Sequence, residues 1–199
     1  MNYRVKHVST ERELDATLSF EIQIFGCPSE DNSPAYSREK WMERMSSPYH
    51  DLMLYAESDG EVIGIVFGRI VNEYCITVGP VAVDEQYRER GIAREMMLLL
   101  EERALGHGIH NLGLGAQEGA EGFYLKLGYF GSLLIQSEIH SIEDMLALND
   151  KYEVIRTGVF DGTVNQVNLS LPAPDRELQR KYEKTLPGCY TQMIFGKTI

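Results

Sequence analysis

One stretch near the middle of the chain constrains its fold more than any other, because it reads as a strand that leads directly into a helix. The stretch runs from Val78 to Met97, with the sequence VGPVAVDEQYRERGIAREMM. Inside the strand, Gly79 weakens pairing and Pro80 has no backbone N–H to donate. The pair therefore predicts a β-bulge, which would splay this strand from a neighbour and leave main-chain donors and acceptors available.

The start of the helix has the composition of an anion-binding site. Gly91 has no Cβ and Ala93 has only a methyl group, so a ligand can approach the backbone N–H groups at the positive end of the helix dipole. Three guanidinium groups stand at the same place and can pair with further phosphate oxygens, those of Arg88, Arg90 and Arg94. The stretch therefore predicts a seat for a diphosphate.

Two motifs in this sequence resemble the signatures of one family. Arg88-x-x-Gly91-x-Ala93, after the apolar residues 81–83, is similar to the Arg/Gln-x-x-Gly-x-Gly/Ala signature of the GNAT superfamily of acetyl-CoA-dependent N-acetyltransferases. Residues 122–129, GFYLKLGY, are similar to the second GNAT signature, a helix ending in a Tyr followed by a glycine-aromatic pair that opens the next strand. The two motifs occur in the family's order and spacing.

The pattern of expected elements agrees with this resemblance from residue 3 to about residue 135. A helix capped by Ser9 or Thr10 follows a first strand, and Asp59-Gly60 predicts a hairpin turn. The expected strands cover residues 3–8, 52–57, 62–71, 74–83, 110–114 and 129–139, and the expected helices cover residues 11–25, 37–45, 91–104 and 118–127. The resemblance implies an α/β fold, an α+β mixed sheet with splayed central strands.

The last third of the chain predicts a further α+β segment. A helix at 142–148, strands at 152–160 and 164–171, a helix at 174–185 and a strand at 190–195 complete, with the strand at 129, a β-α-β-β-α-β pattern like that of ferredoxin. We expect residues 1–140 to form the acetyl-CoA-binding core and residues 141–199 to form an extension that covers the acceptor site or makes a dimer contact. The alternative is that the tail completes the core, whose seventh strand is any of the last three.

Composition limits the class of protein and its partners. The chain has 199 residues, 43% of them hydrophobic, which is enough for one domain with an appendage or two small ones. No run approaches the roughly 18 apolar residues that span a bilayer, so we expect a cytoplasmic protein that binds no membrane. The formal charge of −11 argues against a nucleic-acid partner. Free thiols are expected at Cys27, Cys75 and Cys189.

The resemblance implies separate roles for these residues if the ligand is acetyl-CoA. Five consecutive backbone amides would hold the diphosphate, those of Arg90, Gly91, Ile92, Ala93 and Arg94, with the Arg88 side chain nearby. The main chain of Val81 and Val83 would pair with the pantetheine amides as a further strand would. A free amide of Val81 or Ala82 would stabilise the oxyanion of the tetrahedral intermediate.

Tyr124 matches the tyrosine of the second signature, which implies that it protonates the departing CoA thiolate. Transfer in this family is direct, from thioester to amine, so no cysteine is required. An unperturbed thiol has a pKa of about 8.5 and a phenol one of about 10, so the proton transfer is slightly uphill and is helped by proximity. The alternative is that Tyr124 is a core residue with a satisfied hydroxyl.

The general base is left open. Several family members place a Glu where this chain has Thr77, which is not a base at neutral pH. Glu73 could act through water, as could Tyr74 or an acidic residue of the loop at 30–31, or the amine could arrive neutral. The preferred interpretation of Glu73 is a solvated turn residue.

Acceptor specificity in this fold comes from the first two helices, their connecting loop and the tail. An aromatic and acidic wall suited to a cationic amine could be formed by Tyr36, Trp41, Glu21, Glu30 and Asp31. The competing and preferred interpretation is that Trp41 packs in the core and the carboxylates are solvated. His107 and His110 lack a third ligand of suitable spacing, so no metal is expected.

These observations predict an enzyme, an acyltransferase that moves an acetyl group from acetyl-CoA to a primary amine on a small molecule. One alternative is a catalytically inactive acyl-CoA-binding sensor or interaction module, and another is a protein or peptide N-acetyltransferase. Neither the acceptor nor the oligomeric state can be derived from the sequence, and a homodimer is one option.

Overall fold

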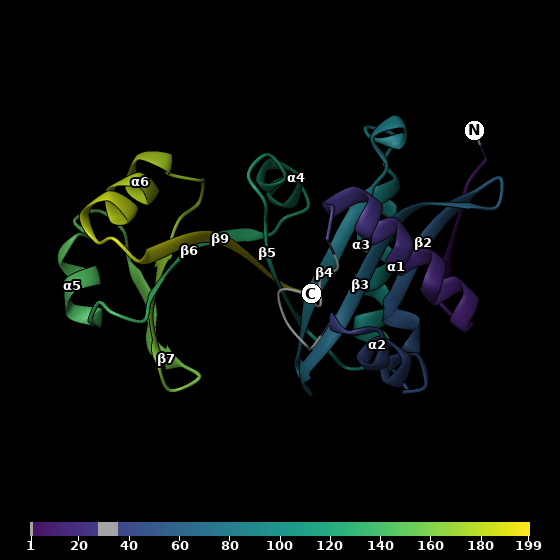
Figure 1. Cartoon of the computed structure of the whole chain (residues 1–199), viewed down its shortest axis with the longest axis horizontal. Helices are drawn as coiled ribbons and strands as arrows, with labels where there is room; N and C mark the ends of the chain where they lie inside the picture. The colour runs from purple at the N-terminus through teal and green to yellow at the C-terminus, as the bar shows by residue number, and fades with distance from the viewer. Residues whose placement is uncertain (1, 28–35) are drawn as a thin grey trace. The chain divides into compact units, whose positions relative to one another are not determined.

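A computed structural model of the chain describes residues 2–27 and 36–199 (Figure 1). These residues form nine β-strands and six α-helices in a mixed α/β arrangement, which confirms the predicted fold class. Two compact units are formed, one from residues up to Leu112 together with Thr198 and Ile199, and one from Gly113–Lys197. The division predicted between residues 140 and 141 concerns roles in binding and stays a prediction.

The first unit is built on an antiparallel sheet. Its strands are adjacent in chain order: β1 (Arg4–His7), β2 (Met53–Ser58), β3 (Glu61–Asn72) and β4 (Cys75–Val83). The turn between β2 and β3 has φ angles of 52° at Asp59 and 84° at Gly60, as the Asp-Gly pair predicts. β5 (Asn111–Gly115) begins beside the start of β4, where the N–H groups of His110 and Asn111 donate to the carbonyl oxygen of Tyr74.

Helices cover both faces of this sheet. α1 (Glu11–Phe25) begins with a capping box between Thr10 and Glu13, and α2 (Arg38–Met45) is capped by the Ser37 hydroxyl. Both pack over one face of β2 and β3, and α3 (Ile92–Gly106) packs over the other (Figure 1). The core on the α1 and α2 face is apolar and includes Leu14, Phe20, Trp41, Met53, Tyr55, Ile65, Phe67 and Ala82.

The second unit has the ferredoxin-like arrangement that its sequence pattern predicts. Its elements are α4 (Glu121–Lys126), β6 (Phe130–Ser137), α5 (Ile142–Ala147), β7 (Val154–Phe160), β8 (Val164–Ser170), α6 (Arg176–Thr185) and β9 (Cys189–Thr198). The sheet order is β9-β6-β8-β7, and each neighbouring pair is antiparallel. Each helix-linked pair of strands is therefore split by a third strand.

The position of β9 decides which of the three late strands enters the middle of the sheet. β9 lies between β5 and β6 in the strand order, whereas β8 and β7 continue the sheet beyond β6. The roles predicted for the tail, a cover of the acceptor site or a dimer contact, stay predictions. The last strand of the tail fills a place between two earlier strands, and the rest of it extends the sheet.

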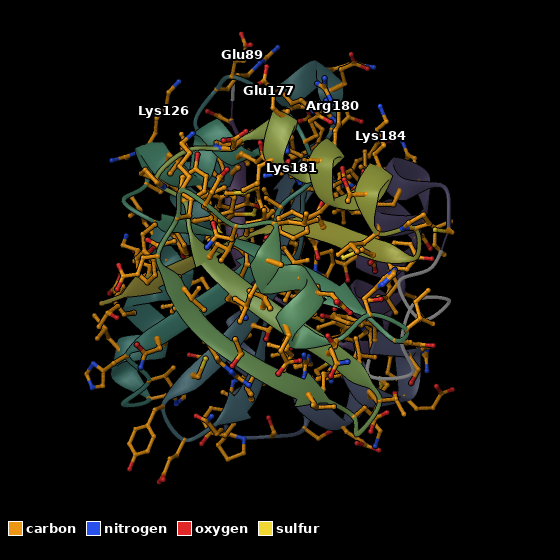
Figure 2. All side chains as sticks on the ribbon, turned by 90° about the vertical axis from the view of Figure 1, so that its left-hand side faces the viewer. Glu89, Lys126, Glu177, Arg180, Lys181 and Lys184 are labelled. Carbon is orange, nitrogen blue, oxygen red and sulfur yellow. The ribbon has the colours of Figure 1, made fainter. Side chains whose placement is uncertain are left out.

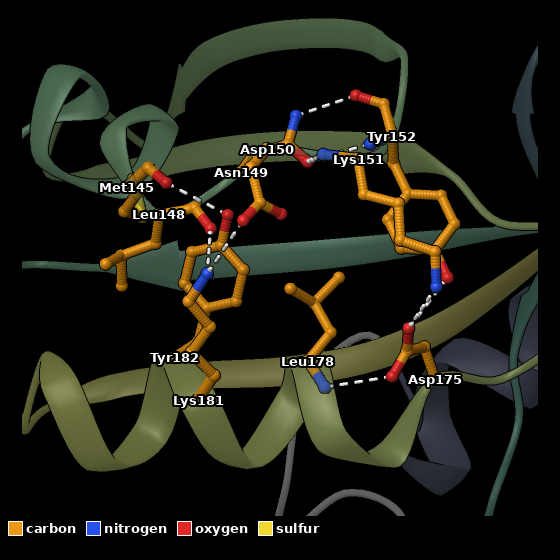
Figure 3. A network of polar contacts seen from close by, with 10 residues as sticks. All are labelled: Met145, Leu148, Asn149, Asp150, Lys151, Tyr152, Asp175, Leu178, Lys181 and Tyr182. Carbon is orange, nitrogen blue, oxygen red and sulfur yellow. Dashed lines mark hydrogen bonds and ion pairs between the residues drawn. The ribbon is translucent and has the colours of Figure 1, made fainter.

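Polar contacts join α5 and α6 to the loops of the second unit (Figure 3). The Tyr182 hydroxyl donates to the carbonyl oxygen of Met145 at 2.9 Å, which ties α6 to α5. Asp175 caps α6 by accepting the Leu178 N–H at 2.9 Å, and also accepts the Tyr152 hydroxyl at 2.7 Å. The opposite face of α6 is exposed and charged, with Glu177, Arg180 and Lys184 directed outward (Figure 2). Lys181 belongs to the polar network, because its Nζ donates to the carbonyl oxygen of Leu148 at 2.8 Å (Figure 3).

Two sequence expectations needed adjustment at element ends. α4 begins at Glu121 rather than near residue 118, because Gly119 has a φ of 93° and residues 118–120 form a turn. β9 is longer than expected and reaches Thr198. In the described part of the chain no helix combines the length and apolar character that crossing a membrane requires. The three cysteines, Cys27, Cys75 and Cys189, are free thiols.

Candidate active site

The predicted irregularity in β4 is present. On β3 the pairing register shifts between Val66 and Gly68. One residue of β3, Phe67, therefore lies opposite two residues of β4, Gly79 and Pro80, which is a β-bulge. Gly79 has a φ of 154° and the Gly79-Pro80 peptide bond is cis. The sequence alone was sufficient to find this feature.

The bulge is followed by three residues whose backbone groups alternate in direction. The N–H of Asp84 donates to the carbonyl oxygen of Ile63 at 3.0 Å, so the backbone of Asp84 points toward β3. In an antiparallel pair this direction alternates along the strand, so the backbone groups of Ala82 also point toward β3. Those of Val81 and Val83 point away from β3. Of the two amides considered for the oxyanion, only that of Val81 has this outward direction.

The turn after β4 leads into α3, whose first N–H groups have no acceptor within the helix. The short 3₁₀ helix η4 (Glu85–Tyr87) is capped by Asp84, and Gly91 is the N-cap of α3 with a φ of 83°. The first helical hydrogen bond runs from the Glu95 N–H to the Gly91 carbonyl oxygen at 2.9 Å. The N–H groups of residues 92–94 therefore precede the helical ladder. A Cβ built on Gly91 would meet no atom within 4 Å, so the space above the helix start is open.

Two of the three predicted arginines are fixed by carbonyl groups of this turn. The Arg88 Nε donates to the Val83 carbonyl oxygen at 3.1 Å, and the Arg90 Nη2 donates to the Gln86 carbonyl oxygen at 2.8 Å. The Arg90 guanidinium also lies 5.6 Å from the ring centre of Tyr87. These contacts hold both side chains beside the start of α3. All the predicted residues from Val81 to Arg94 are thus brought into one continuous strand, turn and helix start.

A cleft of about 530 Å³ opens beside the same helix start. Its lining comes from the first three turns of α3 and the N-terminal segment, with the residues Tyr3, Arg90, Gly91, Arg94, Glu95, Leu98, Leu99 and Glu102. The volume lies in the range of small-molecule sites. Sequence reasoning missed the Tyr3 contribution, because the contact joins residues far apart in the chain.

Tyr124 lies in α4 of the second unit and is 5% exposed. Its ring contacts those of Tyr129 and Phe195, at centroid distances of 6.0 and 5.7 Å. Burial raises the pKa of the Tyr124 phenol to about 12, so it is protonated at neutral pH. Of the residues that the structure describes, none forms a hydrogen bond with the Tyr124 hydroxyl, and both interpretations of this residue, proton donor and core tyrosine, stay predictions.

The candidates for the general base lie along β3 and β4. Glu73 is an exposed residue of the turn between these strands. From the rise of a strand, its Cα lies roughly 20 Å along the chain from the bulge at Gly79. Thr77 is half-buried and lies directly opposite Arg69 of β3. Thr77, the position at which the sequence resemblance implied a Glu in several family members, is therefore paired with an arginine of the neighbouring strand.

The residues expected as an acceptor wall have mixed positions. Trp41 is fully buried, and its ring lies 5.0 Å from that of Phe67 and 6.0 Å from that of Tyr36, so its expected place in the core is confirmed. Glu21 is 2% exposed, so the expectation that it is solvated was wrong. Burial raises the pKa of Glu21 to about 7. Glu30 and Asp31 lie outside the described residues.

A polar cavity of about 300 Å³ in the second unit had no signal in the sequence. Arg176 of α6 forms an ion pair with Glu118 at 3.1 Å and a second one with Glu121, which is buried at the start of α4. Gln192 of β9 lines the same cavity. Glu121 lies one helical turn before Tyr124, so the cavity borders the helix that carries the predicted acid.

In the described residues no group of three or more His, Cys, Asp or Glu side chains is placed so that it could hold a metal ion.

Comparison with known proteins agrees with these features. Residues 16–129, more than half of the chain, match the model of the Acetyltransferase (GNAT) family. The chain is therefore an acyltransferase. It belongs to the GNAT family of acetyltransferases, as the two sequence motifs indicated. A search of curated proteins found no match.

Solved structures show the same fold at low sequence identity. The ribosomal-protein-S18-alanine N-acetyltransferase from Escherichia coli is 16% identical, with a TM-score of 0.53 over 88% of this chain and 98% of that one. The PaiA N-acetyltransferase from Thermoplasma acidophilum, in complex with coenzyme A, is 16% identical, with a TM-score of 0.51 over 86% and 100%. N-acetylglutamate synthase from Neisseria gonorrhoeae, with coenzyme A and N-acetyl-glutamate, is 14% identical, with a TM-score of 0.50 over 100% and 35%.

Proposed function

We propose that this GNAT enzyme transfers an acetyl group from acetyl-CoA to a primary amine on a small molecule, by direct attack of the amine on the thioester. The observation that carries the proposal is the start of α3. The three N–H groups of residues 92–94 have no acceptor within the helix, and the space next to Gly91 is open. A diphosphate fits such a site by charge and by hydrogen bonding. Solved members of the fold in complex with coenzyme A support the choice of cosubstrate.

The cofactor would run from the helix start toward the bulge of β4. The diphosphate accepts hydrogen bonds from the backbone amides of residues 90–94. Arg88, Arg90 and Arg94 supply positive charge around it. The outward backbone groups of Val81 and the outward N–H of Val83 are available to the pantetheine amides in the manner of an added strand, whereas the Val83 carbonyl oxygen already accepts a hydrogen bond from Arg88. The Val81 amide is the better candidate for the oxyanion, because the Ala82 amide points toward β3.

Tyr124 would donate a proton or a strong hydrogen bond to the CoA thiolate as it leaves. Its pKa of about 12 keeps the phenol protonated, so its hydroxyl carries a proton to donate at neutral pH. Full transfer from this phenol to a thiolate of pKa about 8.5 is uphill by about 5 kcal/mol. Stabilisation of the developing thiolate by a hydrogen bond is therefore the larger part of the role we assign to Tyr124.

The amine must lose a proton before it attacks. We propose Glu73 as a base that acts through water. Because its Cα lies roughly 20 Å along the strand from the bulge, the proton would have to pass along a chain of waters. An acceptor that arrives neutral needs no base. Location in the cytoplasm and a homodimer remain predictions from the sequence.

A second candidate function is an acyl-CoA-binding module without catalysis. The feature in its favour is Thr77, which cannot accept a proton at neutral pH and stands where the resemblance implies a Glu in several family members. The likeness to solved structures concerns the fold alone and does not choose between small-molecule and protein acceptors.

The test is release of free CoA thiol from acetyl-CoA in the presence of amine acceptors, with a Tyr124→Phe variant beside the wild type. We expect turnover with at least one class of amine, a rate lowered by at least about tenfold in Tyr124→Phe, and unchanged coenzyme A binding by calorimetry. Tyr129→Phe is the matched control, because Tyr129 is an equally buried tyrosine 6.0 Å from the same ring. Coenzyme A binding without turnover on any amine would favour the inactive module, and an unchanged rate in Tyr124→Phe would remove this residue from the mechanism.

A further inference from the structure

Two arginines and two aromatic rings form a cluster on the α1 and α2 face of the first unit. The Arg69 guanidinium carbon, from β3, lies 5.5 Å from the ring centre of Tyr36, and the Tyr36 ring lies 6.0 Å from that of Trp41. The Arg44 guanidinium carbon, from α2, lies 4.2 Å from the ring centre of Trp41. We call Arg44, Arg69, Tyr36 and Trp41 the arginine-aromatic cluster.

Two donors of this cluster are buried without a partner. The Trp41 Nε1 and the Arg69 Nε are both inaccessible to solvent and have no hydrogen-bond acceptor in the described part of the chain. Trp41 as a whole is 0% exposed. A buried indole N–H and a buried guanidinium N–H are almost always hydrogen-bonded in folded proteins. The two donors therefore indicate an acceptor group that residues 2–27 and 36–199 do not supply.

The charge of the cluster points to an anion. Burial lowers the pKa of Arg44, and the positive charge of Arg69 lowers it further, so the two guanidinium groups lie close enough to repel. Tyr36 and the carboxylate of Glu43 act on the pKa of Arg44 in the opposite direction. Arg69 forms no ion pair with any described residue. Two cations are thus concentrated here in a chain whose formal charge is −11.

The cluster borders the part of β4 on which the proposed function depends. The side chains of Phe67 and Arg69 lie on the same face of β3, and Phe67 both packs against Trp41 and lies opposite the bulge of β4. Arg69 lies opposite Thr77, two residues before the bulge residue Gly79. An anionic group on the cluster would therefore lie within a few residues of the bulged backbone.

We propose that the arginine-aromatic cluster binds the carboxylate of the acceptor, so that the substrates are amino carboxylates of the amino-acid class rather than polyamines. The inference rests on the proposed function, because it assigns the acceptor of the same reaction. A guanidinium fork suits the two oxygens of a carboxylate, and the indole N–H adds a third donor. The acceptor is held by its carboxylate while its amine, once deprotonated, attacks the thioester carbon and CoA thiol leaves.

The first experiment compares acceptors that differ only in the anion. Transfer to β-alanine is measured beside β-alaninamide, and beside O-phosphoethanolamine. We expect kcat/KM for β-alanine to exceed that for the amide by at least about tenfold, which corresponds to 1.4 kcal/mol. The ratio should fall close to one in Arg69→Met and stay as in wild type in Arg38→Met, whose arginine pairs with Asp15 on the outer side of α2. Equal rates with acid and amide, or a preference for the phosphate, would overturn the assignment of a carboxylate.

The second experiment needs no turnover and uses wild-type protein. Trp41 is the sole tryptophan of the chain, so its fluorescence reports on the cluster directly. We expect N-acetyl-β-alanine, the product of the proposed reaction, to change this emission saturably, and its neutral amide to leave it unchanged. The carboxylate response should be lost in Arg69→Met.

The outcomes separate the two proposals. Turnover on amines without discrimination for the carboxylate, and without a fluorescence response, would overturn the carboxylate site and leave acetyl transfer standing. A carboxylate-specific fluorescence response without turnover on any amine would support the site and overturn acetyl transfer.

Discussion

Replacing Gly91 by alanine tests the helix start as the diphosphate site. Gly91 has a φ of 83°, a left-handed conformation that costs a residue with a Cβ about 1–2 kcal/mol. The added methyl group meets no protein atom within 4 Å, so it projects into the space where a ligand would lie. One hydrogen bond to a charged group contributes roughly 1.5–3 kcal/mol. Displacing one phosphate oxygen should therefore raise the dissociation constant for coenzyme A by about tenfold to one hundredfold.

The matched control is Gly60→Ala in the hairpin between β2 and β3. Gly60 has a φ of 84° and equally open surroundings, so both variants carry the same backbone strain. Urea unfolding should give a similar loss of stability for the two, whereas calorimetry with coenzyme A should give weaker binding for Gly91→Ala alone. Equal affinity in wild type, Gly60→Ala and Gly91→Ala would refute a diphosphate at this backbone.

Two further variants test the energetics of buried polar groups. Burial raises the pKa of Glu21 to about 7, so the folded chain retains a proton that the unfolded chain loses near pH 4, and stability should fall as pH rises from about 4 to 7. Glu21→Gln should flatten this dependence and be more stable than wild type above pH 7 by up to about 3 kcal/mol. If the free energy of unfolding, measured with urea, changed with pH in the same way in both proteins, the burial of a titrating carboxyl would be contradicted. Tyr182→Phe leaves the Met145 carbonyl without its 2.9 Å donor and should lower the thermal midpoint by the equivalent of about 1–3 kcal/mol, while Tyr190→Phe, at an exposed tyrosine, should not.

Local chemistry made much of the fold predictable from the sequence. Capping residues marked the starts of α1 and α2, and an Asp-Gly pair fixed the hairpin turn at residue 60. The bulge at Gly79 followed from the backbone properties of glycine and proline alone. The turn after β4 was equally predictable, because its glycine and arginines lie close together in the sequence. These features depend on neighbouring residues, so a sequence contains them directly.

Pairings between distant residues were not predictable in the same way. The pattern of apolar and polar residues identified three late strands, but it did not show that β9 pairs with β6. Such a pattern says which side of a strand faces the core, and several neighbouring strands would be compatible with it. The burial of Glu21 and the orphaned donors of Trp41 and Arg69 also had no signal, since each depends on what covers the side chain. The sequence likewise did not predict that Tyr36 and Trp41 each contact an arginine side chain.

The register of β6 and β9 has a consequence for how the last third of the chain is connected. Ser137 at the end of β6 pairs with Cys189 at the beginning of β9, so residues 138–188 join two points that are adjacent in the sheet. A short hairpin turn could make the same connection. A chimaera that joins the two strands by such a turn would reveal what residues 138–188 add, including the pairing of β8 with β6.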